Sequence, residues 1–164
     1  MKYLIAIVGP TAAGKSELAI NLAQCFEGEL INADSRQVYR YMDIGTSKPT
    51  SAEQSLVPHH LIDVVDPNED FSQAEYCGLA TKAIEAVQQK GKLPLLVGGS
   101  GLYVWSVVEG WNVPAVRPNK QLRHALEFKA QEEGSDALYQ ELNAVDPSAA
   151  SKIHPGKIRR IIRA

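Results

Sequence analysis

Residues 9–16 read Gly9-Pro10-Thr11-Ala12-Ala13-Gly14-Lys15-Ser16 and match the pattern G-x-x-x-x-G-K-[ST] at every defined position. An apolar, β-branched run over residues 2–8 precedes this stretch and predicts a strand buried on both faces. Residues 15–24 follow it and place their apolar side chains on one helical face. A strand, a glycine-containing turn and an amphipathic helix in this order predict a phosphate-binding loop (P-loop) in an α/β protein.

Strand and helix signals go on alternating after this stretch. Further strands are predicted at residues 29–33, 60–65 and 93–97. Helices are predicted at 72–90, where Ser72 and Glu75 form a capping box, and at 102–109. The alternation predicts an α/β fold with an open parallel sheet flanked by helices. The loops at 9–16, 34–39 and 98–101 then open at the carboxyl ends of the strands, where such folds bind ligands.

Strand signals disappear after Trp111, and the rest of the chain reads as helical. Helices are predicted at 118–133, 135–145, 146–152 and 157–163. We therefore predict two domains, a P-loop α/β core at residues 1–115 and a helical C-terminal appendage at residues 116–164.

Composition excludes several classes of protein. The chain has 164 residues, of which 45% are hydrophobic and 22% charged, as is ordinary for a globular protein. It has no apolar run of the roughly 18 residues that a membrane span needs, so we expect no membrane partner. Its 2 cysteines form no Cys-x-x-Cys motif and suit a reducing cytoplasm. We expect a cytoplasmic monomer.

The glycine-containing loop predicts specific chemistry. Its backbone N–H groups, together with the positive end of the following helix, can surround phosphate oxygens. Lys15 then neutralises the outer phosphate, and the Ser16 hydroxyl is a ligand for Mg²⁺. The loop alone indicates a polyphosphate with Mg²⁺ and does not specify a nucleoside triphosphate.

Polar residues also follow the second and fourth predicted strands. Asp34 can hold Mg²⁺, act as a general base or cap the next helix. Gln37, in the stretch Asp34-Ser35-Arg36-Gln37, can read an adenine through two hydrogen bonds. Ser100 either presents its hydroxyl to a ligand or caps a helix. Adjacent His59 and His60 point to opposite faces of a strand, which argues against a shared metal.

The net charge of −2 is unevenly distributed. Residues 151–164 carry basic side chains and no acidic ones, at Lys152, Lys157, Arg159, Arg160 and Arg163. With Ile158, Ile161 and Ile162 these arginines predict a basic helix with an apolar face. Such a helix either packs through its isoleucines as an ordinary solvated surface helix or contacts phosphates of a nucleic acid.

Five blocks of the sequence, in order, resemble the tRNA dimethylallyltransferase (tRNA isopentenyltransferase) family. They are GPTAAGKS at 9–16, INADSRQVYRYMDIGTSKP at 31–49, VPHHLIDVVDP at 57–67, GKLPLLVGGSGLY at 91–103 and DPSAASKIHPGKIRRIIRA at 146–164. The resemblance implies transfer of a dimethylallyl group from dimethylallyl diphosphate to N6 of the adenosine next to the anticodon. The partners it implies are dimethylallyl diphosphate and the tRNA anticodon loop, with Mg²⁺ as cofactor.

The same resemblance implies roles for individual residues. Asp34 is the general base, and Thr11 and Ser100 belong with it to the catalytic set; Ser100 stands where the family usually has Thr. Residues 9–16 bind the diphosphate, and Ser16 binds the metal. The implied tRNA-binding residues are Asp34, Ser35, Arg36, Gln37, Arg159, Arg160 and Arg163.

The chain departs from the family pattern in two places. Gly156-Lys157 replaces the Asn-Asp usual after His-Pro, which puts the tRNA contact there in question. Family members also continue past the position of Ala164 with a helical portion that holds another diphosphate-binding arginine. We therefore expect the 164-residue chain to bind diphosphate but to transfer prenyl groups poorly.

Three alternatives remain open from the sequence. An adenylate isopentenyltransferase that acts on free AMP, ADP or ATP shares the same loop and fold. A small-molecule kinase or NTPase uses the loop for ATP, although a second acidic magnesium motif is not evident. A non-catalytic RNA-binding fragment would use only the basic C-terminal residues.

Overall fold

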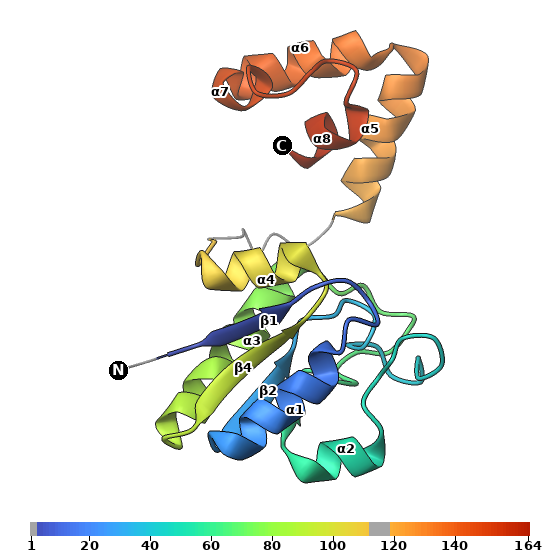
Figure 1. Ribbon diagram of the computed structural model, residues 1–164. Coiled ribbons are helices and arrows are strands. Elements are labelled where there is room, and N and C mark those ends of the chain that lie inside the picture. Colours follow the sequence, from blue (N-terminus) through green and yellow to red (C-terminus); the bar gives the residue numbers. More distant parts are fainter. Residues whose placement is uncertain (1–2, 112–118) are drawn as a thin grey trace. The chain divides into compact units, whose positions relative to one another are not determined.

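A computed structural model describes residues 3–111 and 119–164 (Figure 1). By contacts the chain divides into two compact units, Met1–Ala115 and Val116–Ala164.

The first unit is built on a parallel sheet, as the sequence predicts. Its strands are β1 (Ile5–Val8), β2 (Gly28–Asn32), β3 (His59–His60) and β4 (Leu93–Gly98), in the order β1-β4-β2-β3. All three pairings are parallel, and Leu95 of β4 lies opposite Ile5 on one side and Leu30 on the other. The α/β fold class is confirmed.

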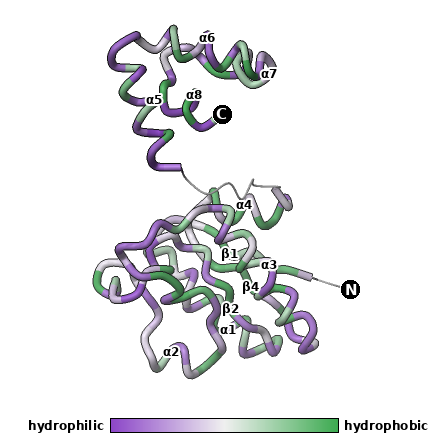
Figure 2. Tube along the Cα trace, turned by 180° about the vertical axis from the view of Figure 1, so that it is seen from behind, coloured by the Kyte–Doolittle hydropathy of each residue, from purple (hydrophilic) through white to green (hydrophobic). Residues whose placement is uncertain are grey.

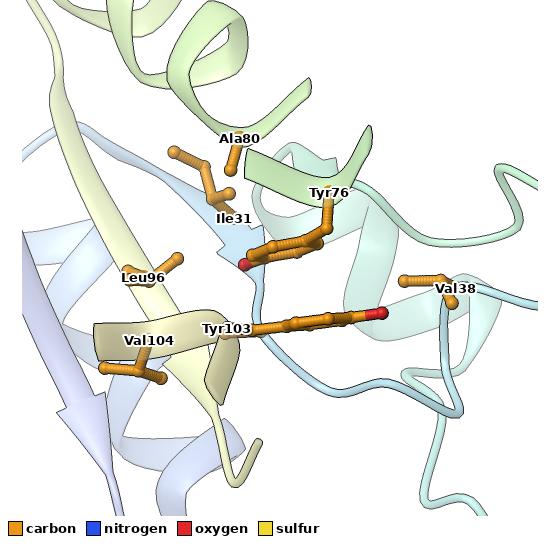
Figure 3. Packing of buried hydrophobic residues seen from close by; sticks show 8 residues of the cluster. Ile31, Val38, Tyr76, Ala80, Leu96, Tyr103 and Val104 are labelled. Carbon is orange, nitrogen blue, oxygen red and sulfur yellow. The ribbon is translucent and has the colours of Figure 1, made fainter. Parts of the chain in front are cut away.

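Helices cover both faces of this sheet. Helix α1 (Lys15–Cys25) packs Ala19, Ile20 and Ala23 against Leu30 and Leu95 on one face. Helices α3 (Gln73–Gln89) and α4 (Gly101–Val108) pack on the other, around Ile31 and Leu96. There the rings of Tyr76 and Tyr103 stack 3.8 Å apart (Figure 3). The capping box of Ser72 and Glu75 forms as predicted.

A short helix, α2 (Ser51–Leu56), lies where the sequence analysis predicts none. It begins with a second capping box, in which the Thr50 hydroxyl accepts a hydrogen bond from the Glu53 amide and the Glu53 carboxylate accepts one from the Thr50 amide. The spacing Thr50-x-x-Glu53 is a helix-start signal that is present in the sequence.

Two of the strand predictions are wrong in detail. Strand β1 is not buried on both faces: Ile7 is buried, but Ile5 is 37% and Val8 57% exposed. The reason is the strand order, which places β1 at the edge of the sheet beside β4 alone. The strand predicted at 60–65 stops at His60, because Leu61 and Asp63 adopt left-handed backbone conformations with φ of 63° and 56°.

The second unit is entirely helical in its described residues. Its helices are α5 (Lys120–Glu132), α6 (Ser135–Val145), α7 (Pro147–Ala150) and α8 (Ile158–Arg163). Ala130, Leu138 and Ile161 form its small core, and α5 is largely hydrophilic along its length (Figure 2). The start of the helix predicted at 118–133 lies outside the described residues at position 118. Of the helices described in either unit, none is both long and apolar enough to cross a bilayer.

Candidate active site

A cavity of about 320 Å³ opens at the carboxyl ends of the strands in the α/β unit. The loops at 9–16, 34–39 and 98–101 all contribute to it, as their positions after parallel strands predict. Its walls are formed by Thr11, Ala12, Ala13, Gly14, Lys15, Ser16, Glu17, Leu30, Asn32, Asp34, Gln37, Thr46, Ser47, Pro49, Glu53, His59, Ile62, Val97, Gly98 and Gly99. Gly9, Pro10, Ser35, Arg36 and Ser100 are not among these wall residues.

The loop that precedes α1 has the backbone of an anion-binding turn. Gly14 adopts φ of 75° immediately before Lys15, a left-handed conformation that glycine adopts without steric cost. Gly14 has no side chain to accept hydrogen bonds from the first-turn amides of α1, so these amides are available to an anion. The Lys15 ammonium bends back over the loop and donates to the Pro10 carbonyl at 2.6 Å.

Asp34 is held in the cavity wall by its neighbour in β2. The Asn32 side chain accepts a hydrogen bond from the Asp34 amide at 3.0 Å and donates to the Asp34 carbonyl at 3.1 Å. Asn32 Nδ2 also donates to the Leu61 carbonyl, and the buried Tyr76 hydroxyl donates to the Asn32 carbonyl. This network fixes the Asp34 backbone against the end of β2, Leu61 and α3.

The Asp34 carboxylate does not cap a helix. Its Oδ1 accepts a hydrogen bond from the Arg36 amide at 2.8 Å, within a turn that no helix follows directly. Helix capping, one of the three roles open from the sequence, is thus replaced by a local turn. The remaining carboxylate oxygen, Oδ2, is the atom that can take up a proton or contact a ligand.

Ser100 joins two of the loops. Its amide donates to the Ala33 carbonyl, and its Oγ accepts from the Ser35 amide at 2.8 Å. Ser100 is the N-cap residue of α4, as the capping interpretation expects, but its side chain makes no helix-capping hydrogen bond. A methyl group at Gly98 would overlap the Ala33 carbonyl, so this close approach of β4 to the segment after β2 requires glycine.

Gln37 lies in the cavity wall with part of its hydrogen-bonding capacity already used. Its Nε2 donates to the carbonyls of Thr46 and Ser47, both at 3.0 Å. These two bonds use both amide protons, so only Oε1 is left for a ligand. The predicted two-bond contact to adenine is therefore reduced to one acceptor, which suits an amino group.

Several wall residues were given no role in the sequence analysis, among them Glu53, Thr46 and Ser47. Nothing in the spacing of Thr46, Ser47 and Glu53 indicates that they share a cavity, and only the tertiary fold brings them to it. Burial lowers the pKa of His59, and this exceeds the opposing effects of a hydrogen bond to the Val57 carbonyl and of Glu53. His60 instead contacts Glu29, which confirms that the two histidines point to opposite faces.

The cavity wall is chemically suited to Mg²⁺ together with a phosphate. The Ser16 hydroxyl and the carboxylates of Glu17 and Asp34 supply the hard oxygen donors that this ion takes. Within residues 3–111 and 119–164, no three His, Cys, Asp or Glu side chains cluster as a metal cage. A magnesium ion here would accordingly take part of its shell from phosphate oxygens and water.

The three arginines of α8 lie on its exposed side. Arg159, Arg160 and Arg163 are exposed, whereas Ile161 is buried in the core of that unit. The predicted isoleucine face is thus confirmed, and the arginines are accessible on the surface of the unit.

Comparison with known proteins assigns the chain to a family. The family model described as IPP transferase matches residues 37–164. The tRNA dimethylallyltransferase of Roseiflexus castenholzii is 60% identical over 98% of this chain and 53% of its own length. That of Chloroflexus aurantiacus is 55% identical over 100% of this chain and 55% of its own length.

Solved structures give the same result. The full-length tRNA isopentenylpyrophosphate transferase of Bacillus halodurans superposes with a TM-score of 0.68 at 48% identity, over 99% of this chain and 54% of that one. A eukaryotic dimethylallyltransferase acting on tRNA superposes with a TM-score of 0.81 at 34% identity, over 99% of this chain and 40% of that one. The chain spans about half the length of the curated relatives it matches. On the strength of the family model and these relatives, the chain belongs to the IPP transferase family.

Proposed function

We propose that this chain carries the catalytic centre of an enzyme that transfers a dimethylallyl group from dimethylallyl diphosphate to N6 of the adenosine next to the anticodon in tRNA. One observation carries the proposal: Lys15, Ser16 and Asp34 line the same cavity. A diphosphate-binding loop and a base in one cavity are what transfer to a weakly nucleophilic amine requires. The names of the relatives support the choice of tRNA as acceptor.

In the proposed reaction every bond, electron pair and proton is accounted for by the two substrates and the residues of this cavity. A bond forms between adenine N6 and the allylic C1 carbon, and the bond from C1 to the diphosphate oxygen breaks. The electron pair of the broken bond leaves with the diphosphate, and the N6 proton passes to Asp34. Charge that develops on the leaving group would be stabilised by the loop amides before Ser16 and by Lys15, once its ammonium turns from the Pro10 carbonyl to the diphosphate.

Mg²⁺, when bound beside Ser16, would supply further positive charge to the diphosphate. We assign Thr11 to the same diphosphate, because it lies at the cavity wall in the loop. Ser100 is not in the wall, and its proposed contribution is to hold Ser35 and hence the Asp34 turn. Gln37 Oε1 is assigned to accept a hydrogen bond from the adenine amine.

The remaining assignments concern the RNA. Arg36 is exposed in the turn after Asp34, and we assign it to tRNA phosphates. Arg159, Arg160 and Arg163 are assigned to the same polyanion from the helical unit, which is the proposed beginning of the tRNA-binding part. A tRNA acceptor implies a cytoplasmic enzyme, and we propose that it acts as a monomer.

A labelling assay tests the function. The chain is incubated with radiolabelled dimethylallyl diphosphate and Mg²⁺, and with tRNA, AMP or no acceptor. We expect diphosphate binding and slow labelling of tRNA alone. In Asp34→Asn, transfer should fall by about 10²–10⁴-fold while diphosphate binding stays within twofold, because only the base is lost. The control Glu85→Gln removes an exposed carboxylate of α3 and should leave transfer unchanged.

Two results, with ATP hydrolysis measured alongside, would overturn the proposed function, and a third would overturn the role of Asp34. Label found on AMP and not on tRNA would indicate an adenylate isopentenyltransferase. ATP hydrolysis without any binding of dimethylallyl diphosphate would indicate a kinase or NTPase. Full transfer by Asp34→Asn would remove Asp34 as the base.

A further inference from the structure

The loop between β2 and α2 exposes two large hydrophobic side chains. Tyr41 is 81% exposed and Ile44 is 99% exposed. Of the large hydrophobic side chains that the structure describes in the α/β unit, these two are the most exposed. Single exposed apolar residues are common, so exposure alone does not indicate a function for Tyr41 and Ile44. The position of the loop that carries them must be considered as well. The loop extends beyond the sheet in Figure 1, where it is coloured cyan.

The loop is held in place by a nearly buried lysine. The Lys48 side chain is only 5% exposed, and its ammonium donates to the carboxylates of Asp43 and Asp63, both at 2.7 Å. The same ammonium donates to the Tyr39 carbonyl at 2.9 Å. These contacts outweigh the effect of burial and raise the pKa of Lys48, so the side chain is charged and the attachment persists at neutral pH. The loop thus has a fixed conformation with Tyr41 and Ile44 on its outside.

The same loop forms part of the cavity wall. Thr46 and Ser47 line the cavity, and their carbonyls accept both amide protons of Gln37. Ile44 is two residues from Thr46, a chain distance of at most about 7 Å. Ile44 thus lies close to a wall residue, and the Thr46 hydroxyl donates to the carbonyl of Met42, the residue next to Tyr41, at 2.6 Å.

Tyr41 also has an unfavourable backbone conformation. Its φ is 63°, a left-handed value that is unfavourable for a residue with a bulky side chain. The flanking residues keep it there, since the Arg40 amide donates to the Val65 carbonyl and Lys48 holds Tyr39. Strain that the surrounding contacts maintain is a recurring property of binding loops.

We propose that Tyr41 and Ile44 form a platform that binds the bases flanking the target adenosine, an inference that rests on the function proposed above. A base that enters the cavity leaves its stack, and its neighbours lose their stacking partner. Aromatic and aliphatic side chains at the rim replace that partner without reading sequence. The platform would therefore raise affinity for RNA and leave affinity for dimethylallyl diphosphate unchanged.

The test measures binding of an anticodon stem-loop RNA to the whole chain by fluorescence anisotropy. We expect Tyr41→Ala to weaken binding about tenfold and Ile44→Ser to weaken it several-fold. Tyr41→Phe should bind as the wild type does, because the ring is retained. The matched control is Phe26→Ala, since Phe26 is 60% exposed and follows the end of α1 remote from the cavity.

Cross-linking identifies the contact directly. With 5-iodouridine on either side of the target adenosine, irradiation should couple the RNA to Tyr41, and the yield should fall in Tyr41→Ala but not in Phe26→Ala. If the wild type binds the stem-loop and Tyr41→Ala and Ile44→Ser bind it equally well, the platform is refuted and the proposed function stands. Equal weakening by Tyr41→Phe and Tyr41→Ala would also refute stacking. If the wild type binds no RNA, both the platform and the tRNA acceptor are rejected.

Discussion

Replacing Glu29 by Gln tests how the sheet beneath the cavity is held together. The Glu29 side chain is 1% exposed in β2, where it is surrounded by three basic groups. His60 Nε2 lies 2.7 Å from Oε2, Lys90 Nζ 3.0 Å from Oε2, and Lys92 Nζ 3.0 Å from Oε1. Burial alone would raise the pKa of Glu29, but hydrogen bonds from His60, Lys90 and Lys92 outweigh it and lower the pKa from 4.5 to about 2.

The magnitude follows from this pKa. A tenfold change in acid dissociation corresponds to about 1.4 kcal/mol, so the ionised carboxylate stabilises the fold by at most about 3 kcal/mol. Lys90 and Lys92 are 52% and 39% exposed, and solvent screening weakens their share. We therefore expect Glu29→Gln to lower the free energy of unfolding by about 2 kcal/mol at pH 7.

The lowered pKa also determines how this stabilisation changes with pH. Because the folded-state pKa lies below the unfolded one, the contribution is complete above about pH 5 and is lost as the pH falls towards 2. The difference between Glu29→Gln and wild type should therefore shrink over that interval.

Urea unfolding followed by tryptophan fluorescence reports the stability of the α/β unit, which contains Glu29. Both tryptophans of the chain, Trp105 and Trp111, belong to the α/β unit. The matched control, Glu85→Gln, alters an exposed carboxylate of α3 and should change stability by less than about 0.5 kcal/mol. A Glu29→Gln protein as stable as wild type at pH 7 would refute the reasoning, as would a difference that persists unchanged at pH 2.

Three further predictions concern the cavity and the basic helix. Lys15→Ala should weaken binding of dimethylallyl diphosphate at least about tenfold in isothermal titration, since a charge-assisted contact to phosphate is lost; equal affinity would exclude residues 9–16 as the diphosphate site. Gly98→Ala should lower the free energy of unfolding by about 1–3 kcal/mol in urea, because its methyl group meets the Ala33 carbonyl. Gly78→Ala, on α3 with open space around it, should instead stabilise by about 0.5–1 kcal/mol, and the reasoning fails if the two behave alike. Replacing Arg159 and Arg160 by Gln should reduce the slope of log affinity for tRNA against log salt by roughly 1–2, and an unchanged slope would show that α8 makes no phosphate contact.

The sequence by itself determined the features that depend on near neighbours. The turn at Gly14-Lys15-Ser16, the helix start at Ser72 and the alternation of strand and helix all follow from local backbone preferences and hydrophobic periodicity. Parallel topology then predicts that loops after different strands meet at one end of the sheet, which is why Lys15 and Asp34 were expected together.

Only the tertiary structure decided which residues meet across long separations in the sequence. The exposure of Ile5 depends on the strand order, and His60, Lys90 and Lys92, which contact Glu29, are 31 to 63 positions from it in the sequence. Folding likewise brings Lys48 to Asp63, and the Gln37 side-chain amide to the Thr46 and Ser47 carbonyls that accept its two hydrogen bonds. Hydrogen bonds and ion pairs form between atoms about 3 Å apart in space and produce no periodic pattern in the sequence. They can therefore be identified only from the folded structure.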